Sequence, residues 1–367
     1  MPFGIKSSGL NPTTFSFSRF GGATVKLDGN PAHGSFPASG NVLKPQSPRQ
    51  FKVGVLGLGL MGTSIATCLL AAGHPVAGVE AKARRRKGVR RQVLALLKEL
   101  EREGLLKSEP ASVIERLSVS SDCEAFRMCG LVIESITESV AAKKRALQRI
   151  EEVVSARALI GSNTSAIPIT GLQQGALHAD RIMGIHWAEP AHVTRFMEIV
   201  CGKQTRLACA EAVADLARRW WGKEPSLVRR DVRGFITNRI CYAMFREAIH
   251  LVESGVATIA DVDQSVRNDV GYWSTFAGPF RFMDLTGVPA YETVMHDLLS
   301  DLSCSKKVPR LIKKIVSSGG QGVFNGKGFY RYTPAEARRW QKRFLEFSYD
   351  VRKLAMKYAE ERRRTSG

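Results

Sequence analysis

The stretch Phe51-Lys-Val-Gly-Val-Leu-Gly57-Leu-Gly59-Leu-Met-Gly62 decides the fold. Its apolar first half predicts a buried β-strand, and the strand ends in glycines with the spacing GxGxxG. Gly57 permits a tight turn, Gly59 lets the backbone approach a ligand without a Cβ, and Gly62 lets strand and helix pack closely. The helix predicted over 60–72 would direct free N–H groups at a phosphate. The stretch therefore predicts a phosphate-binding turn.

An acidic residue completes this motif. A second predicted strand, Val76–Val79, ends at Glu80, whose carboxylate can accept hydrogen bonds from a ribose 2′-hydroxyl. The order strand, helix, strand, acid predicts a dinucleotide site, and the carboxylate favours NAD over NADP. The predicted cofactor residues are Gly57, Gly59, Leu60, Met61, Gly62 and Glu80.

The basic run from Lys82 to Lys87 leaves a second anionic group open at the same place. That group would be the 2′-phosphate of NADP or the phosphates of a second ligand such as coenzyme A. The alternative is a basic helix face that only contacts solvent.

The chain divides into four parts by composition. Residues 1–50, rich in Ser, Gly and Pro with Asp28 as their one acid, predict an irregular extension, with an organelle transit peptide as the alternative. Residues 51–230 alternate short apolar runs with amphipathic stretches, which predicts an α/β Rossmann-like domain with a mainly parallel sheet. Residues 231–333 predict an all-α domain, and 334–367 a long basic helix. The predicted strands are Phe51–Leu56, Val76–Val79, Leu131–Ile133, Leu159–Ser162, Arg181–Trp187, Phe196–Val200 and Ser226–Val228.

Charge and cysteine content narrow the function classes. The 367 residues carry 54 Lys+Arg against 34 Asp+Glu, a net charge of +20, which suggests an acidic partner. No nucleic-acid motif is visible, and no run approaches the ~18 apolar residues of a membrane span, so we expect a small-molecule partner. The seven cysteines contain no CxxC pair, which argues against disulfides and zinc and favours the cytoplasm.

A histidine at the end of a predicted strand is the candidate base. His186 follows Gly184-Ile, and ligand chemistry collects at the carboxyl ends of strands in open α/β sheets. Oxidation of an alcohol needs a base near neutral pH, and a carboxylate on the other ring nitrogen would fix its tautomer. Glu198, on the next predicted strand, is the candidate carboxylate. Spacing alone also allows a histidine satisfied in the core, and His192 competes for the role.

Eight segments, in this order and spacing, resemble the L-3-hydroxyacyl-CoA dehydrogenase family over about residues 51–333. They are Gly57–Gly62 with Glu80, Leu131-Val-Ile-Glu134-Ser, Gly161-Ser-Asn163-Thr-Ser165, Gly184-Ile-His186, Met197-Glu198-Ile-Val, Arg233-Gly-Phe-Ile-Thr-Asn238-Arg239, Ala277-Gly-Pro-Phe280 and Gly326-Lys-Gly-Phe-Tyr330.

The resemblance implies a specific reaction. His186 would be the general base, paired with Glu198, in NAD-dependent oxidation of the 3-hydroxyl of a 3-hydroxyacyl-CoA, a step of fatty acid metabolism. Ser165 and Asn238 would contact the substrate or hold its oxygen, although turn and cap roles are the alternative for both.

The resemblance also assigns residues and an assembly outside the base. Glu134 and Asn163 match residues that line the NAD site. The helical domain would supply a homodimer interface and part of the substrate site.

Two features depart from the usual pattern. Glu189 stands where the family usually has asparagine, which places a second carboxylate near His186 and predicts an activity optimum at higher pH or a substrate with positive or hydrogen-bond-donating character. The stretch Trp273-Ser-Thr-Phe-Ala-Gly-Pro-Phe resembles the branch that oxidises small free β-hydroxy acids and carnitine. A catalytically impaired NAD-binding homologue is the remaining alternative.

Overall fold

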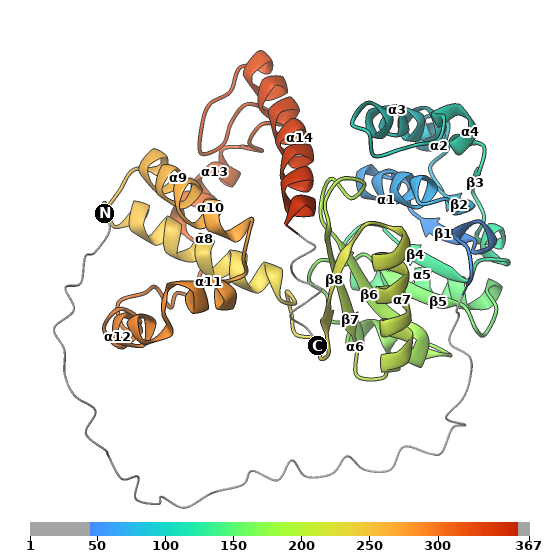
Figure 1. The fold of residues 1–367 in the computed structure, drawn as a ribbon, viewed down its shortest axis with the longest axis horizontal. Coiled ribbons are helices and arrows are strands. Elements are labelled where there is room, and N and C mark those ends of the chain that lie inside the picture. The colour runs from blue at the N-terminus through green and yellow to red at the C-terminus, as the bar shows by residue number, and fades with distance from the viewer. Residues whose placement is uncertain (1–44, 359–367) are drawn as a thin grey trace, which may run out of the picture. The chain divides into compact units, whose positions relative to one another are not determined.

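The computed structural model describes residues 45–358, so the predicted extension over 1–50 lies almost wholly outside the described residues. An eight-stranded sheet has the order β3-β2-β1-β4-β5-β6-β7-β8 (Figure 1). All neighbouring pairs are parallel except β6 and β7, which are antiparallel. The strands are β1 Val53–Leu56, β2 Val76–Val79, β3 Leu117–Ser120, β4 Leu131–Glu134, β5 Leu159–Ser162, β6 Ile182–Trp187, β7 Phe196–Cys201 and β8 Glu224–Val228.

The apolar runs of the sequence form the strands as expected, and the mainly parallel Rossmann-like sheet is confirmed. The sequence analysis missed one strand, β3. Of its four residues, only Leu117 is buried, and Ser118 is exposed at the edge of the sheet. An edge strand buries little, so it lacks the continuous apolar run by which the other parallel strands were found.

Helices cover both faces of the sheet. The helices of this region are α1 Leu60–Ala71, α2 Ala83–Arg86, α3 Val89–Arg102, α4 Pro110–Ile114, α5 Val140–Val153, α6 Ile169–Gln173 and α7 Leu207–Trp220. One core cluster packs α1, α3 and α7 on the sheet, through residues such as Leu69, Leu97 and Val213. A second cluster packs α5 on the other side, through Leu147 and Ile150. Apolar burial on both faces is what makes a parallel sheet stable.

The glycine turn has the geometry that its residues predicted. Gly57 has φ +89°, a conformation that favours glycine. A Cβ on Gly62 would lie 1.8 Å from the carbonyl oxygen of Gly57, so α1 can start this close to β1 only without a side chain there. The turn therefore leads from β1 directly into α1.

A helical region follows the sheet, as predicted. Its helices are α8 Thr237–Glu253, α9 Ile259–Asn268, α10 Val270–Ser274, α11 Pro279–Thr286, α12 Val288–Leu298 and α13 Arg310–Ser317. None of these helices contains a buried residue. Helices with apolar side chains and no buried face lack a core of their own within the described chain.

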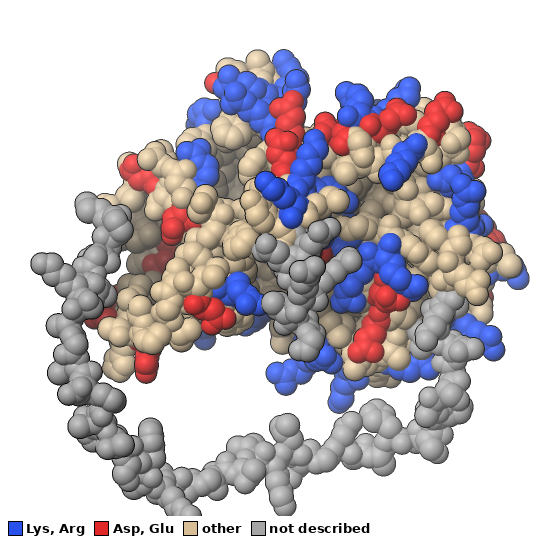
Figure 2. Space-filling model, viewed as in Figure 1, with Lys and Arg blue, Asp and Glu red and all other residues tan. Residues whose placement is uncertain are grey.

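The last helix, α14 Pro334–Lys357, returns to the sheet region. Its Tyr349 is 3% exposed and belongs to the core cluster that contains α1 and α3. The basic helix predicted over 334–367 is thus present as far as Lys357, and residues 359–367 lie outside the described residues. No helix of residues 45–358 is long and apolar enough to cross a membrane. Figure 2 shows Lys and Arg interspersed with Asp and Glu on the displayed face.

Candidate active site

His186 and Glu198 meet across the antiparallel strands β6 and β7. The two residues are register partners, and Nδ1 of His186 lies 2.8 Å from Oε2 of Glu198. Both side chains are buried, with His186 7% and Glu198 1% exposed. A carboxylate only accepts, so Nδ1 carries a hydrogen, and in the neutral imidazole the lone pair is then on Nε2. The predicted pair is therefore formed, with the tautomer that a general base needs.

The second carboxylate oxygen of Glu198 is bound by the start of α8. Oε1 accepts hydrogen bonds from the backbone N–H of Ile236 at 3.1 Å and of Thr237 at 2.9 Å. Burial alone would raise the pKa of Glu198, but the hydrogen bond from His186, those from the two N–H groups and the charge of His186 outweigh it and lower the pKa. Glu198 is thus held ionised beside the imidazole.

Two aromatic rings fix the imidazole from its sides. Phe196 meets His186 edge to face at a centroid distance of 5.3 Å, and Phe235 does so at 5.8 Å. Phe235 is buried and has φ +52°, which is strained for a bulky residue. That conformation turns the chain so that the next two N–H groups reach Glu198. The strain is therefore placed where it serves the site.

Ser165 and Asn238 also come together. Nδ2 of Asn238 donates to the carbonyl oxygen of Ser165 at 2.6 Å, which leaves one N–H and Oδ1 of that amide for a ligand. Ser165 is exposed, and its hydroxyl makes no hydrogen bond with residues 45–358. Both side chains therefore keep polar groups available, as the substrate roles implied for them require.

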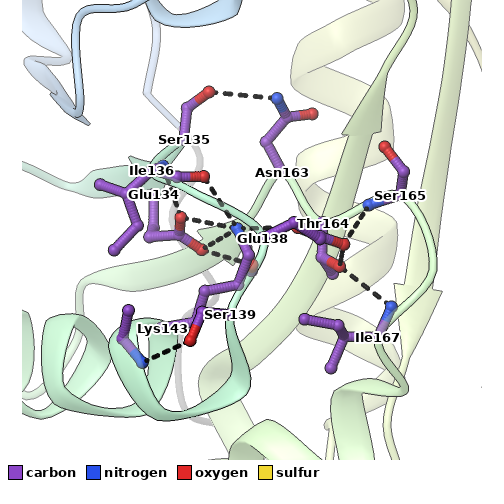
Figure 3. A network of polar contacts seen from close by, with 12 residues as sticks. Glu134, Ser135, Ile136, Glu138, Ser139, Lys143, Asn163, Thr164, Ser165 and Ile167 are labelled. Atoms are coloured by element: carbon purple, nitrogen blue, oxygen red, sulfur yellow. Dashed lines mark hydrogen bonds and ion pairs between the residues drawn. The ribbon is translucent and has the colours of Figure 1, made fainter. Parts of the chain in front are cut away.

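Asn163 ties three strands together at their carboxyl ends. Its Oδ1 accepts from the N–H of Trp187 at 3.0 Å, and its Nδ2 donates to Oγ of Ser135 at 3.2 Å (Figure 3). These bonds fix the end of β6, where His186 lies, against the end of β4. Asn163 thus lies at the carboxyl ends of the strands, the edge of the sheet where a cofactor is expected to bind.

Glu134 lies beneath that surface. Its side chain is fully buried, with Nζ of Lys143 at 2.8 Å and the Ser162 hydroxyl at 2.6 Å (Figure 3). Its two carboxylate oxygens accept from Lys143, from Ser162 and from the N–H of Ile136, so the structure gives it a supporting role. Direct contact with NAD stays a prediction for this residue.

Glu138 is a site residue that the sequence analysis missed. Its Oε1 accepts from the Thr164 hydroxyl and from the N–H of Ser165, and its Oε2 lies 3.3 Å from Nζ of Lys143. Burial would raise the pKa of Glu138, but Thr164 and Lys143 outweigh it and lower the pKa. Figure 3 shows the carboxylate between the loops after β4 and β5. It therefore positions the backbone of Ser165. Its only sequence signal is that it follows β4, at the edge where ligands bind.

Glu80 stands beside the glycine turn as predicted. Its carboxylate accepts from the N–H of Leu58 at 3.2 Å and of Lys82 at 3.0 Å, and Nη1 of Arg85 lies 3.5 Å away. If Gly59 carried a Cβ, the one atom within 4 Å of it, its neighbours in the turn aside, would be that same Nη1 of Arg85, at 3.8 Å.

These contacts test whether a dinucleotide fits. The backbone at Gly59 is open to close approach, α1 begins directly after it, and Glu80 lies beside it with acceptor capacity remaining. The residues present therefore fit NAD, with the pyrophosphate at the start of α1 and the adenosine ribose at Glu80.

The rival histidine has a structural role. Nδ1 of His192 lies 2.7 Å from Oγ of Ser64, and Nε2 lies 3.5 Å from Glu99. With both ring nitrogens engaged and the side chain buried, His192 is not free to accept a substrate proton. Glu189 is exposed, and its side chain forms no hydrogen bond or ion pair with residues 45–358, so its predicted effect on His186 stays a prediction. Residues 45–358 contain no cluster of His, Cys, Asp or Glu that could hold a metal.

An imidazole fixed in one tautomer, at the sheet edge that also carries a dinucleotide turn, is the arrangement of an NAD-dependent dehydrogenase. The comparisons with known proteins specify this class further. The sequence model of the 3-hydroxyacyl-CoA dehydrogenase NAD-binding domain matches residues 52–232, and that of the C-terminal domain matches 234–332. The chain belongs to the 3-hydroxyacyl-CoA dehydrogenase family and is an NAD-dependent oxidoreductase.

Individual relatives differ in their named substrates. The 5-formyl-3-hydroxy-2-methylpyridine 4-carboxylate 5-dehydrogenase of Mesorhizobium japonicum is 30% identical over 290 residues, 79% of this chain and 93% of its own. A probable 3-hydroxybutyryl-CoA dehydrogenase of Deinococcus radiodurans is 32% identical over 77% of this chain and 100% of its own.

Solved structures show the same two kinds of relative. The structure of a 5-formyl-3-hydroxy-2-methylpyridine 4-carboxylic acid 5-dehydrogenase, described as an NAD⁺-dependent dismutase, has a TM-score of 0.78 at 28% identity, covering 83% of this chain and 98% of its own. A (S)-3-hydroxybutyryl-CoA dehydrogenase from Ralstonia eutropha has a TM-score of 0.64 at 28% identity, covering 77% and 99%.

Proposed function

We propose that the chain oxidises the 3-hydroxyl of a 3-hydroxyacyl-CoA to the 3-keto form, with His186 as general base and Glu198 as its partner. The observation that carries this proposal is the 2.8 Å contact between Nδ1 of His186 and Glu198, which leaves Nε2 free. The names of the 3-hydroxybutyryl-CoA dehydrogenase relatives support the substrate class.

Each proton has a defined place in this reaction. Nε2 of His186 takes the hydroxyl proton, and the imidazolium that forms is stabilised by the ionised Glu198. NAD, when bound, supplies the hydride acceptor for the hydrogen on C3. The Ser165 hydroxyl and the remaining amide groups of Asn238 would hold the substrate oxygens, and Glu134 and Asn163 would support the cofactor end.

A spectrophotometric assay tests the proposal. NADH formation is followed with 3-hydroxybutyryl-CoA, L-gulonate and carnitine as separate substrates. We expect turnover of the coenzyme A ester, a loss of about 100-fold or more in kcat for His186→Gln, and a change of less than about threefold for His192→Gln, the matched control. NADH binding without turnover of any substrate would instead favour a non-catalytic NAD-binding homologue.

A second substrate class has its own support. The chain superposes on the pyridine carboxylate dehydrogenase with a TM-score of 0.78, against 0.64 for the 3-hydroxybutyryl-CoA enzyme. A small free acid is therefore the second candidate, and the L-gulonate and carnitine arms of the assay detect it. Turnover of either, with none of the coenzyme A ester, would replace the first proposal.

We further propose a homodimer formed through the helical region. Large apolar side chains of α8 and α11 are exposed, including Ile240 (57%), Tyr242 (69%) and Phe280 (79%). Exposed apolar surface of this extent marks an interaction site, and a second copy of the chain is its simplest cover. A cytoplasmic location is also proposed, because all seven cysteines are unpaired thiols.

A further inference from the structure

The loop between β6 and β7, residues 188–195, joins the two members of the histidine–glutamate pair. It starts two residues after His186 and leads into Phe196, the first residue of β7, whose ring contacts the imidazole. Glu198 follows two residues later. The loop therefore connects the two strands whose register places Glu198 opposite His186.

A buried lysine holds the loop from beneath. Lys223, in the turn between α7 and β8, is 2% exposed, and its Nζ donates to the carbonyl oxygen of Ala191 at 2.6 Å and to that of Thr194. The same Nζ lies 4.9 Å from the ring centre of Trp187, the neighbour of His186. Lys223 thus contacts both the loop and the strand that carries the base.

A second cation reaches the loop from α14. Nη1 of Arg352 donates to the carbonyl oxygen of Val193 at 2.6 Å. The guanidinium also packs on the turn before Lys223, since a Cβ on Gly222 would lie 2.7 Å from Nη2. Helix α14 begins at Pro334, after the last residue matched by the family's two sequence models.

Two ordinary contacts dock α14 on the sheet region. The Tyr349 hydroxyl donates to Glu99 at 2.6 Å, and Nζ of Lys353 lies 2.8 Å from Glu103. The first reaches the loop only through Glu99, which lies 3.5 Å from Nε2 of His192 in that loop, and the second does not reach it. Arg352 is therefore the residue of this helix that donates directly to the loop.

The energetic setting of the two cations is unusual. Within residues 45–358, neither Lys223 nor Arg352 forms an ion pair with an acid, and both donate to loop carbonyls. Lys223 is buried and Arg352 half-buried, and removing such a charge from water without a carboxylate costs free energy that a neutral side chain would avoid. Packing alone would be served better by apolar residues, so the carbonyl contacts are what these cations provide.

We propose that Lys223 and Arg352 are positioning residues, which hold the β6–β7 loop so that Glu198 stays on Nδ1 of His186. The inference rests on the proposed role of the histidine–glutamate pair. It makes α14, which lies outside the matched family domains, a part of the catalytic apparatus. The alternative is that the two cations only contribute to stability.

Arginine variants of the full chain separate these roles. Arg352→Met removes the bond to Val193, Arg352→Lys keeps a cation that can donate to it, and Lys353→Met, the matched control, removes a docking contact of the same helix. The first readout is the downfield proton resonance that an imidazole N–H bound to a carboxylate gives. The second is kcat with 3-hydroxybutyryl-CoA, measured together with the KM for NAD.

We expect Arg352→Met to lose or broaden the proton resonance and to lower kcat about tenfold, with the KM for NAD changed less than about twofold. Arg352→Lys should restore most of both signals, and Lys353→Met should leave both unchanged. If Arg352→Met does not fold, Arg352→Leu replaces it, because its side chain likewise cannot donate a hydrogen bond to Val193.

An unchanged resonance and kcat in folded Arg352→Met would overturn the proposal, even if its stability were reduced. The resonance needs no substrate. A chain that turns over none of the tested substrates would therefore refute the proposed reaction, while the effect of Arg352→Met on the His186 signal would still decide the positioning role.

Discussion

Thr237, the first residue of α8, donates its backbone N–H to Glu198 at 2.9 Å, on the carboxylate oxygen opposite to the one that His186 contacts. The acid of the catalytic pair is therefore bound from two directions, by the strand that carries the base and by the helix that carries Asn238. N–H groups on both of its oxygens favour the ionised carboxylate, which accepts at each.

Glu198→Gln tests this arrangement. The amide can turn its NH₂ group toward Nδ1, which favours the tautomer with hydrogen on Nε2 and removes the lone pair that accepts the proton. We expect kcat to fall about 100-fold or more, while NADH binding changes less than about threefold. Stopped-flow measurement of the hydride-transfer step checks the loss, and a kcat within threefold of the wild type would contradict the assigned tautomer.

Arg85 allows a prediction about cofactor choice. Its guanidinium lies 3.5 Å from Glu80, half exposed, and next to Gly59 at the turn. A cation there would partly offset the repulsion between Glu80 and a 2′-phosphate. We expect Arg85→Ala to lower kcat/KM for NADP about tenfold and for NAD less than about threefold. Arg84→Ala, an exposed neighbour without a hydrogen bond or ion pair to residues 45–358, is the control and should leave the ratio unchanged.

The departure from the family's usual pattern at Glu189 can be tested through the pH dependence of the reaction. A carboxylate near the base favours the protonated imidazole, so the free base is reached only at higher pH. Glu189→Asn should move the rising limb of the pH–rate profile to lower pH by about 0.5 at low salt. Because Glu189 is exposed, added salt should reduce this difference. Identical profiles and substrate preferences for both proteins would refute the role.

The helical region predicts an assembly. Ile240 and Phe245 lie on α8 and are 57% and 47% exposed. A charge in an apolar interface is strongly unfavourable. Ile240→Asp should therefore shift the protein toward monomer and raise the Kd of the dimer about 10-fold or more. Sedimentation velocity measures this. Lys342→Asp, at an exposed position of α14, should leave the association state unchanged; a monomeric wild type would refute the dimer.

Much of the fold could be predicted because its signals are local. The apolar runs of β1, β2, β4 and β5 are buried on both faces, so their composition alone marks them as strands. The glycine turn likewise depends on neighbours in sequence. Strand β3 escaped prediction because its alternation is short and its position is at the sheet edge.

The site was predictable only where a family motif marked it. Spacing alone did not separate His186 from His192, because the difference lies in which ring nitrogens are occupied, and those contacts come from Ser64 and Glu99 far along the chain. Glu138 was missed for the same reason. Its partners Thr164 and Ser165 lie on another loop, and only the sheet brings the two loops together.

The buried ammonium of Lys223 predicts how stability depends on pH. Burial lowers the pKa of Lys223 from 10.5 to about 8, against an opposing effect of Cys68 and with a further lowering by Arg352. Between pH 8 and 10.5 the unfolded chain therefore binds a proton that the folded chain lacks, so the free energy of unfolding contributed by this group rises with pH. Across the whole window, this gain in the free energy of unfolding amounts to about 3 kcal/mol.

Urea unfolding of the wild type and of Lys223→Met between pH 7 and 11 checks this prediction. The difference in unfolding free energy, wild type minus variant, should increase through that window by up to about 3 kcal/mol. Burial raises the pKa of the Cys68 thiol, which acts in the opposite direction at alkaline pH, so the pair is also compared in a Cys68→Ala background. A difference that stays constant or falls with pH in that background would show that Lys223 is not held in a site that disfavours its charge.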